Sequence, residues 1–238
     1  MKLEKIAFFV NKQKGTVTLP IADYLTLTDL EPENVPERVS RRFKRFSVSG
    51  SGHRLIATED AQTKQLVIGI KGARNTLMLG SGINLRGTIA IQGRDLTVSI
   101  GAGTTFNNVE IYCKGKRNGV FIGRDCMFSA GIEIRTSDAH TIIDLDTMQR
   151  CNVADGVYIG DHVWVSKNAF VQKGTTVGSD NVIGYGSMVK GDLDITNAVI
   201  VGAPAKPLRD RRVTWSRQGD LKDVDVDRLK DWQSLPEL

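Results

Sequence analysis

The sequence predicts an all-β fold, a parallel β-solenoid, from two regularities between Ile159 and Val189. Aliphatic residues recur at every sixth position, and mostly small residues follow each of them four places later. The aliphatic series is Ile159, Val165, Val171, Val177, Ile183 and Val189, and the small series is Val163, Ala169, Thr175, Asn181, Ser187 and Leu193. A fixed period this short is typical of a solenoid whose coils stack on one another.

Strand dimensions explain why this period builds a coil. At about 3.3 Å per residue, six residues form a side of about 20 Å, and three sides close a triangular coil of about eighteen residues. The aliphatic side chains would then point to the axis as a continuous core. The small residues would occupy the corners, where larger side chains overpack.

A looser repeat extends the solenoid upstream. Pairs of an aliphatic residue and a glycine recur at Leu79-Gly80, Ile100-Gly101 and Ile122-Gly123, so that the glycines stand at positions 80, 101 and 123. This spacing fits the same coil with three or four residues, roughly, added at one corner. We therefore assign residues 66–208 to the solenoid.

The N-terminal segment, residues 1–65, is less regular. Lys5–Val10 and Thr16–Ile21 could pair as a hairpin across residues 11–15. The basic stretch 38–46 could contact a polyanionic glycan or a membrane surface, but so short a run favours a solvated connector.

The C-terminal tail, residues 209–238, begins after Pro204 and Pro207, which mark the end of the last coil. It starts basic and then becomes mixed in charge. A short helix around Val224–Trp232 could dock over the last coil and cap its exposed strands.

The composition and motifs are those of an ordinary globular protein and argue against a nucleic-acid-binding or a membrane-spanning protein. The chain has 238 residues, 40% of them hydrophobic and 25% charged, as in an ordinary protein with one sizeable core. A net charge of +5 suits an anionic small ligand, and no nucleic-acid-binding motif accompanies it. Because the longest apolar runs, such as Ile6–Val10, are short, we expect neither a membrane-spanning segment nor a signal peptide.

The cysteines indicate the compartment. Cys113, Cys126 and Cys151 form no CxxC motif and leave an odd count, which favours a reducing compartment and hence a cytoplasmic protein. Cys126 occupies one of the small inward positions, so we expect it to be a core residue rather than a nucleophile.

The repeat breaks after Thr136-Ser-Asp-Ala-His140, and residues 141–156 are largely polar. Long loops on a rigid scaffold are usually functional. The loop 137–156 is therefore the first place in which to look for chemistry.

Four motifs in a fixed order give the chain a family resemblance. They are Ser137-Asp-Ala-His140, Ile159-Gly-Asp-His-Val-Trp164, Val182-Ile-Gly-Tyr-Gly-Ser187 and Gly202-Ala-Pro-Ala-Lys206. Between Gly72 and Arg209 the sequence resembles the hexapeptide-repeat, or left-handed β-helix, acyltransferases, and among them the sugar and polysaccharide O-acetyltransferases. The left-handed coil is implied by this resemblance.

The resemblance also implies a reaction, namely direct acetyl transfer from acetyl-CoA to a hydroxyl group of a saccharide. His140 stands at the family's catalytic position, where a neutral imidazole could act as general base near pH 7. Trp164 stands where the family places an aromatic side chain beside the thioester. Asp138 or Asp144 could orient the imidazole, although aspartates are common in turns for backbone bonding alone.

The positions that would hold acetyl-CoA are carried over from the same family. Backbone near Lys167 and at Gly184 and Tyr185 would line the pantetheine arm. The cations that would meet the phosphates are Lys190, Lys206 and Arg209. The family is usually trimeric, with each active site between two subunits, so a homotrimer is the expected assembly.

Other functions remain open from the sequence. The acceptor would be a surface polysaccharide, of capsular or O-antigen type, or its precursor. An amino sugar on a nucleotide carrier, or a small amine, would make the chain an N-acetyltransferase instead, and a scaffold solenoid would have no activity. A zinc-dependent solenoid hydratase would need three histidine ligands, and His53, His140 and His162 include no close pair, so no metal is expected. His162 is expected to be exposed.

Overall fold

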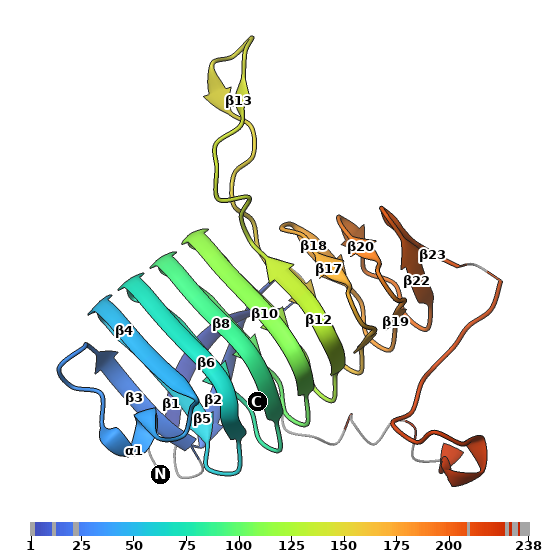
Figure 1. Ribbon diagram of the computed structural model, residues 1–238, viewed down its shortest axis with the longest axis horizontal. Coiled ribbons are helices and arrows are strands. Elements are labelled where there is room, and N and C mark those ends of the chain that lie inside the picture. The colour runs from blue at the N-terminus through green and yellow to red at the C-terminus, as the bar shows by residue number, and fades with distance from the viewer. Residues whose placement is uncertain are drawn as a thin grey trace.

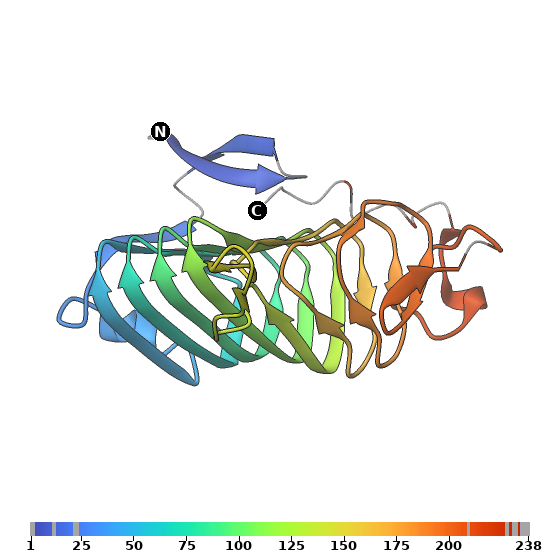
Figure 2. The same ribbon diagram turned by 90° about the horizontal axis from the view of Figure 1, so that it is seen from above.

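The computed structural model describes residues 3–10, 13–20, 24–208, 210–226, 229 and 233. Parallel strands stack in coils along one axis and form two large sheets, of eleven and eight strands (Figure 1). The strands of the stack follow one another along its axis in sequence order, as the colours from blue to red show in Figure 2. The predicted β-solenoid is therefore confirmed.

Each coil of the first half contains one long and one short strand. The long strands are β4 (Arg45–Ser51), β6 (Gln62–Ala73), β8 (Asn84–Arg94), β10 (Thr105–Lys116) and β12 (Met127–Arg135). The short strands are β5 (His53–Thr58), β7 (Thr76–Leu79), β9 (Thr97–Ile100) and β11 (Gly119–Ile122). β6, β8, β10 and β12 bend where the pairing register shifts, between Asn108 and Val109 in β10 for example, so that each of these four supplies two sides of a coil, whereas β4 pairs with β6 along one side only.

The second half has shorter coils with three separate sides. Its strands are β15 (Val157–Ile159), β16 (Trp164–Val165), β17 (Phe170–Val171), β18 (Thr175–Val177), β19 (Val182–Ile183), β20 (Met188–Val189), β21 (Asp192–Leu193), β22 (Val199–Gly202) and β23 (Ala205–Pro207). Val165 pairs with Ile183 and Val171 with Val189, so equivalent positions lie eighteen residues apart.

The core follows the six-residue period. Every member of the aliphatic series is buried, with Ile159 the most accessible at 4%. The small series is buried too, except Leu193, which is only partly covered in the last complete coil. Cys126 is fully buried, as expected for a core residue.

A column of glycines lines one corner of the first half. Gly50, Gly72, Gly93 and Gly115 share one register on successive strands, and all have φ between 98° and 148°. A Cβ on Gly72 would lie 1.9 Å from the carbonyl oxygen of Gly93. Only a residue without a side chain fits both the backbone conformation and this close approach.

The parallel stack extends upstream of residue 66. β4 pairs with β6 and β5 with β7, so a coil begins at Arg45. β3 (Tyr24–Leu30) runs antiparallel to β5, and the short helix α1 (Glu37–Ser40) contributes Val39 to the core. Further upstream, β1 (Leu3–Val10) pairs antiparallel with β2 (Gln13–Pro20).

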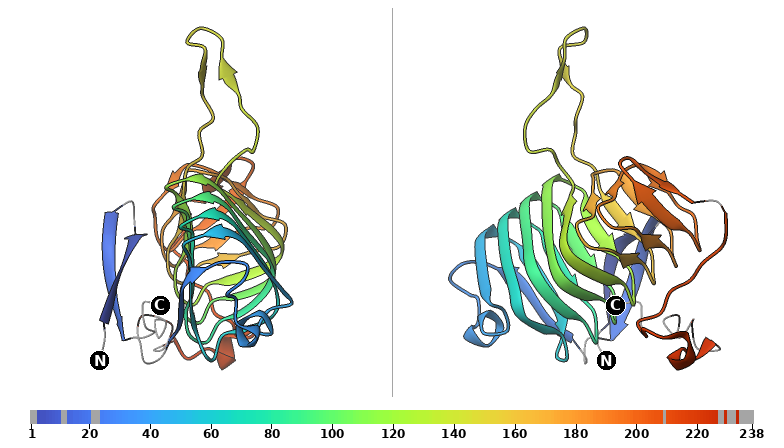
Figure 3. Two further views of the ribbon diagram at one scale, coloured as in Figure 1. Left: turned by 90° about the vertical axis from the view of Figure 1, so that its left-hand side faces the viewer. Right: turned by 45° about the vertical axis from the view of Figure 1, so that its right-hand side comes forward.

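The break in the repeat forms an excursion away from the stack. Its strands β13 (Ile143–Asp144) and β14 (Gln149–Arg150) pair antiparallel, and the hairpin projects far from the coils (Figures 1 and 3). It leaves the edge at which β6, β8 and β10 end. We call this edge, which carries residues 71–74, 92–95, 114–117 and the base of the excursion, the loop edge.

The described part of the tail, residues 210–226, does not cover the strands of the last coil. It turns back along a second edge formed by the corners at Asp125, His162, Asp180 and Asn197, which we call the tail edge. Its described part includes a short 3₁₀ helix at Leu221–Asp223. The expected helix around Val224–Trp232 lies partly outside the described residues.

Candidate active site

His140 is exposed at the base of the excursion, after β12. Its amide donates to the carbonyl of Asp138 at 2.8 Å, and its own carbonyl accepts from Nδ2 of Asn152 at 2.8 Å. Between them Ala139 adopts a positive φ of 66°, which makes the turn tight. The backbone around His140 is thus held on both sides while its imidazole remains accessible.

Asn152 holds the two arms of the excursion together. It is only 7% exposed, although nearly all of its neighbours in the excursion are exposed. Its Nδ2 donates to Asp138 at 2.9 Å as well as to His140, and its Oδ1 accepts from the amide of Ile142 at 2.8 Å. Nothing in the sequence sets Asn152 apart from the other polar residues of the loop 137–156.

Asp138 is bound by neighbours other than the imidazole. Lys173, from the turn after β17, donates to Asp138 Oδ2, and this bond lowers the pKa of the carboxyl below its usual value, with help from Asn152. Asp144 Oδ1 accepts from Thr147 and from the amide of Asp146. Within the described residues, the His140 ring bonds neither carboxylate.

Trp164 lies at a different place from His140. It is the first residue of β16 and is half-buried, paired with Met127 at the start of β12, whereas His140 follows the end of β12. Its ring is 6.1 Å from that of Trp215 in the tail. One chain therefore does not bring the imidazole and this indole together.

Three of the expected acetyl-CoA positions meet at a third edge, the groove edge, at the turns after β16 and β19. The amide of Gly186 donates to the carbonyl of Lys167 at 3.0 Å, which places Lys167 beside Gly184 and Tyr185. Tyr185 is 70% exposed, and its hydroxyl accepts from Asn168.

Of the three cations predicted to meet the phosphates of acetyl-CoA, the two within the described residues do not lie together. Lys206 is exposed on β23 and pairs with Val201, whose side chain approaches Gly184, so it belongs to the groove edge. Lys190 follows β20 at the loop edge instead, in register with Gln172 beside Lys173. Arg209 lies outside the described residues.

The expectation that His162 is exposed is wrong. Its side chain is 5% accessible, Nδ1 is 2.8 Å from Asp180 Oδ1, and Nε2 is 3.7 Å from Asp125 Oδ2. Trp215 stacks on the imidazole and covers it. The corner position does point outward, but the tail, far away in sequence, folds over it.

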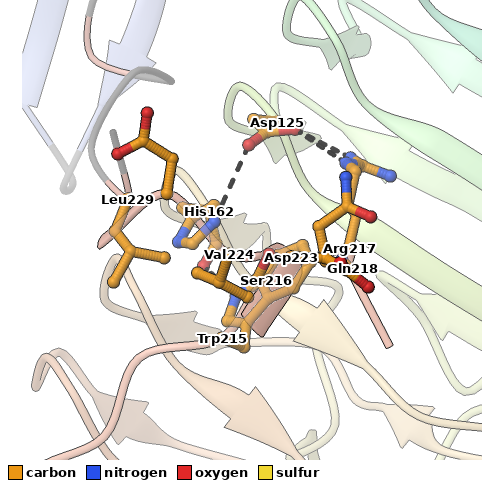
Figure 4. A pocket seen from close by; sticks show the side chains of 10 residues that line it. Asp125, His162, Trp215, Ser216, Arg217, Gln218, Asp223, Val224 and Leu229 are labelled. Atoms are coloured by element: carbon orange, nitrogen blue, oxygen red, sulfur yellow. Dashed lines mark hydrogen bonds and ion pairs between the residues drawn. The ribbon is translucent and has the colours of Figure 1, made fainter. Parts of the chain in front are cut away.

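A cavity of about 370 Å³ opens beside His162 where the tail crosses the coils (Figure 4). In Figure 4 Asp125 lies between His162 and Arg217 and is linked to both. Trp215, Asp223 and Leu229 contribute to the same lining. Burial alone would raise the pKa of Asp180 behind this cluster, but hydrogen bonds from His162, Thr214 and Asn197 outweigh it and lower that pKa.

The described part of the chain offers neither a metal site nor a membrane-spanning helix. No group of three histidine, cysteine or acidic side chains is placed to hold a metal ion. No helix there has both the length and the apolar character needed to cross a membrane.

With this geometry in place, residues 156–191 match the family described as "Bacterial transferase hexapeptide (six repeats)". The chain carries this hexapeptide repeat. The resemblance to the hexapeptide-repeat acyltransferases is thereby confirmed in the coils that carry Trp164, Lys167, Gly184 and Tyr185.

Comparison with solved structures extends the likeness beyond the repeats. The polysialic acid O-acetyltransferase OatWY superposes with a TM-score of 0.63 at 25% identity, over 80% of this chain and 85% of that one. The polysialic-acid-specific acetyltransferase NeuO gives 0.55 at 28% identity, over 80% and 86%. The fold is the left-handed β-helix of these acetyltransferases.

Curated relatives point the same way. The chain is 33% identical to a polysialic acid O-acetyltransferase of Neisseria meningitidis over 131 residues, which are 54% of this chain and 60% of the relative. It is 31% identical to a polysialic acid O-acetyltransferase of Escherichia coli O1:K1 / APEC over 155 residues, 65% and 47%. The chain thus spans between about half and three fifths of the length of these relatives.

Proposed function

We propose that the chain is an acetyltransferase that moves the acetyl group of acetyl-CoA to a hydroxyl group of a saccharide, a capsular polysaccharide or its precursor. The observation that carries this proposal is the exposed His140, fixed by its backbone on a solenoid that resembles two polysialic acid O-acetyltransferases. The exposed free thiol of Cys151 supports a reducing, cytoplasmic setting.

In this mechanism His140 is the general base. Its imidazole takes the proton of the acceptor hydroxyl while that oxygen attacks the thioester carbonyl carbon. The carbon–sulfur bond then breaks, and the imidazolium returns the proton to the departing sulfur. An O-acetyl ester and the free thiol of CoA result. Asp138 and Asn152 position the turn that carries His140, and Trp164 would position the thioester.

The groove edge suits acetyl-CoA. Lys167 and Lys206 supply exposed positive charge for its phosphates, and Gly184 supplies backbone for its arm. At Gly186 an added Cβ would meet no atom within 4 Å, so the edge is open to a ligand there. Arg209, beyond the described residues, would join Lys206, whereas Lys190 fits the acceptor side better.

The separation of His140 and Trp164 within one chain favours an active site built by two chains, as in the expected homotrimer. The excursion also exposes large apolar side chains that an assembly would cover. These are Ile142, Ile143, Leu145, Met148 and Val153, between 53% and 82% accessible. So many exposed apolar residues on one hairpin favour contact with another chain.

The reaction is tested by the release of free thiol from acetyl-CoA with polysialic acid and with a panel of neutral oligosaccharides and nucleotide sugars. His140→Ala should abolish release, and Thr141→Ala, in the exposed neighbouring position, should not. An alkali-labile product would identify an ester, and a stable one the amide of an N-acetyltransferase. Wild-type protein that releases no thiol with any acceptor would contradict the proposal.

The shared active site is tested by subunit mixing. His140→Ala and Trp164→Ala proteins, each inactive alone, are unfolded together and refolded as mixed oligomers. If each site takes its two residues from different chains, some sites regain both and activity returns. Activity that stays absent in well-folded mixed oligomers would place both residues in one chain.

A further inference from the structure

The loop edge is strongly basic on the coils that precede the excursion. Six exposed or partly exposed cations lie there and form what we call the basic ladder: Lys71, Arg74, Arg94, Lys114, Lys116 and Arg117. Asp95 is the one carboxylate within residues 71–74, 92–95 and 114–117. The ladder thus has a net charge of +5, equal to that of the whole chain.

The register of the strands stacks these charges. Lys71 and Lys114 flank Gln92 on adjacent strands, and Arg94 lies directly beside Lys116. Arg74, Asp95 and Arg117 occupy the next corner, each with φ between 54° and 57°. Successive coils are about 4.8 Å apart, so the six cations stand in three short adjacent columns that together form one compact strip of positive charge.

The ladder is neutralised internally at one cation only, within the described residues. Arg74 pairs with Asp95 through two hydrogen bonds, of 2.7 and 3.0 Å. This pairing lowers the pKa of Asp95, and Arg94 and Arg117 contribute to the shift. Within the described residues, no other ladder cation forms a salt bridge.

Arg94 and Lys116 are like charges directly opposite on neighbouring strands, an arrangement that destabilises a sheet. An anion bound beside this pair would relieve the repulsion. Four of the six cations, Lys71, Arg94, Lys114 and Lys116, belong to β6, β8 and β10, and Arg74 and Arg117 directly follow β6 and β10. The strip is therefore held by the strands, and no long loop has to become ordered for binding.

The ladder leads to His140. The amide of Lys114 donates to Oγ1 of Thr136 at 2.8 Å, and the same hydroxyl donates back to the carbonyl of Lys114. Thr136 is the last residue before the loop that carries His140. In Figure 1 the excursion rises from the edge at which the arrowheads of β6, β8 and β10 end.

We infer that the basic ladder is a docking site for a polyanionic saccharide chain, which it aligns so that one hydroxyl group reaches His140. The inference rests on the proposed function and names the acceptor class of that site. A saccharide with a carboxylate on every unit matches a compact strip of several cations, and guanidinium groups bind carboxylates in a bidentate manner. A neutral chain would gain nothing from this strip.

The test compares two triple variants with equal loss of charge. Arg94→Gln/Lys116→Gln/Arg117→Gln removes half of the ladder. Lys44→Gln/Lys64→Gln/Arg86→Gln removes three exposed cations, of which Lys64 and Arg86 lie near the starts of β6 and β8 and Lys44 lies just before β4. Binding to immobilised polysialic acid is measured at low and moderate salt. The ladder variant should bind about tenfold more weakly and with a smaller salt dependence, and the control within about twofold of wild type.

Equal binding by wild type and the ladder variant, or an equal loss in the control, would overturn the inference. Duplex DNA that bound as tightly as the saccharide would overturn the assignment to a saccharide. Thiol release is followed in parallel: the ladder variant should raise KM for polysialic acid and leave KM for acetyl-CoA unchanged. Polymer binding without any thiol release would refute the proposed function alone, and transfer that the ladder variant leaves unchanged would refute the ladder alone.

Discussion

Trp215 stacks on His162 with ring centroids 4.3 Å apart and planes inclined by 10°, and its indole Nε1 donates to the carbonyl of His162 at 2.8 Å. Around this pair, Thr214 donates to Asp180 and Arg217 to Asp125. The tail is thereby tied to three successive coils. The contact buries a polar edge of the solenoid that the repeat alone would leave open.

The first prediction concerns this contact. Trp215 is only 6% exposed, so Trp215→Ala should free the tail and lower the free energy of unfolding by up to about 3 kcal/mol. Limited proteolysis should cut the tail faster, and thermal unfolding should begin earlier. Leu221→Ala, in the same tail but 77% exposed, is the control and should behave as wild type. A tail that resists protease equally in both variants would contradict the assignment.

The second prediction concerns the glycine column. A Cβ on Gly93 would lie 2.0 Å from the carbonyl oxygen of Gly115, a backbone atom that cannot move without shifting a coil. Its φ of 148° adds strain for any other residue. Gly93→Ala should therefore destabilise the protein by at least about 3 kcal/mol in urea unfolding.

Gly219→Ala is the matched control, because an added Cβ there meets nothing within 4 Å. It should change the stability by less than about 0.5 kcal/mol. A Gly93→Ala protein as stable as this control would mean that the coils are not in the register described.

The third prediction concerns thiol reactivity. Burial raises the pKa of both Cys113 and Cys126 to about 12, whereas Cys151 is exposed in the excursion. Since the thiolate is the reactive form, a disulfide reagent at pH 8 should label Cys151 alone in the native protein and all three cysteines after unfolding. Cys151→Ser should abolish the native labelling. Rapid reaction of a second thiol in that variant would show that a coil opens.

The sequence predicts the core because the period decides which way each side chain points. Val165 and Ala169 are buried because they occupy the aliphatic and the small position of the six-residue repeat, which both point to the axis of the coil. The same repeat contains the information that Lys190 and Gly184 lie at different corners. Gly184 follows Ile183, Lys190 follows Val189, and these two valine or isoleucine positions are six residues apart, which is one side of the coil. The predicted solenoid begins at residue 66 and omits the coil that starts with β4, because β4 precedes the first of the aliphatic–glycine pairs, Leu79-Gly80.

The remaining features depend on contacts between residues distant in sequence. The repeat marks the corner position of His162 as outward but does not reveal that Trp215, 53 residues later, covers it. The hydrogen bond from Lys173 to Asp138 also joins residues far apart in sequence, 35 positions, because successive coils lie side by side. Motif order identified His140 and Trp164, but only the strand pairing shows that one chain holds them apart.

The last prediction separates positioning from binding at the candidate site. Asn152 joins Ile142, His140 and Asp138 by hydrogen bonds of 2.8 to 2.9 Å. Asn152→Ala removes all three and should let the turn that carries His140 move. A misplaced general base loses much of its contribution, so kcat should fall about tenfold to a hundredfold.

Because Lys167 and Lys206 lie on the groove edge, KM for acetyl-CoA should stay unchanged, and Tm should too because the excursion lies outside the core. Thr147→Ala, at the hairpin tip, is the control and should keep full turnover. A loss of Tm as large as the loss of kcat would make Asn152 a folding residue, and unchanged kcat would show that His140 is held without it. Either result would refute its positioning role.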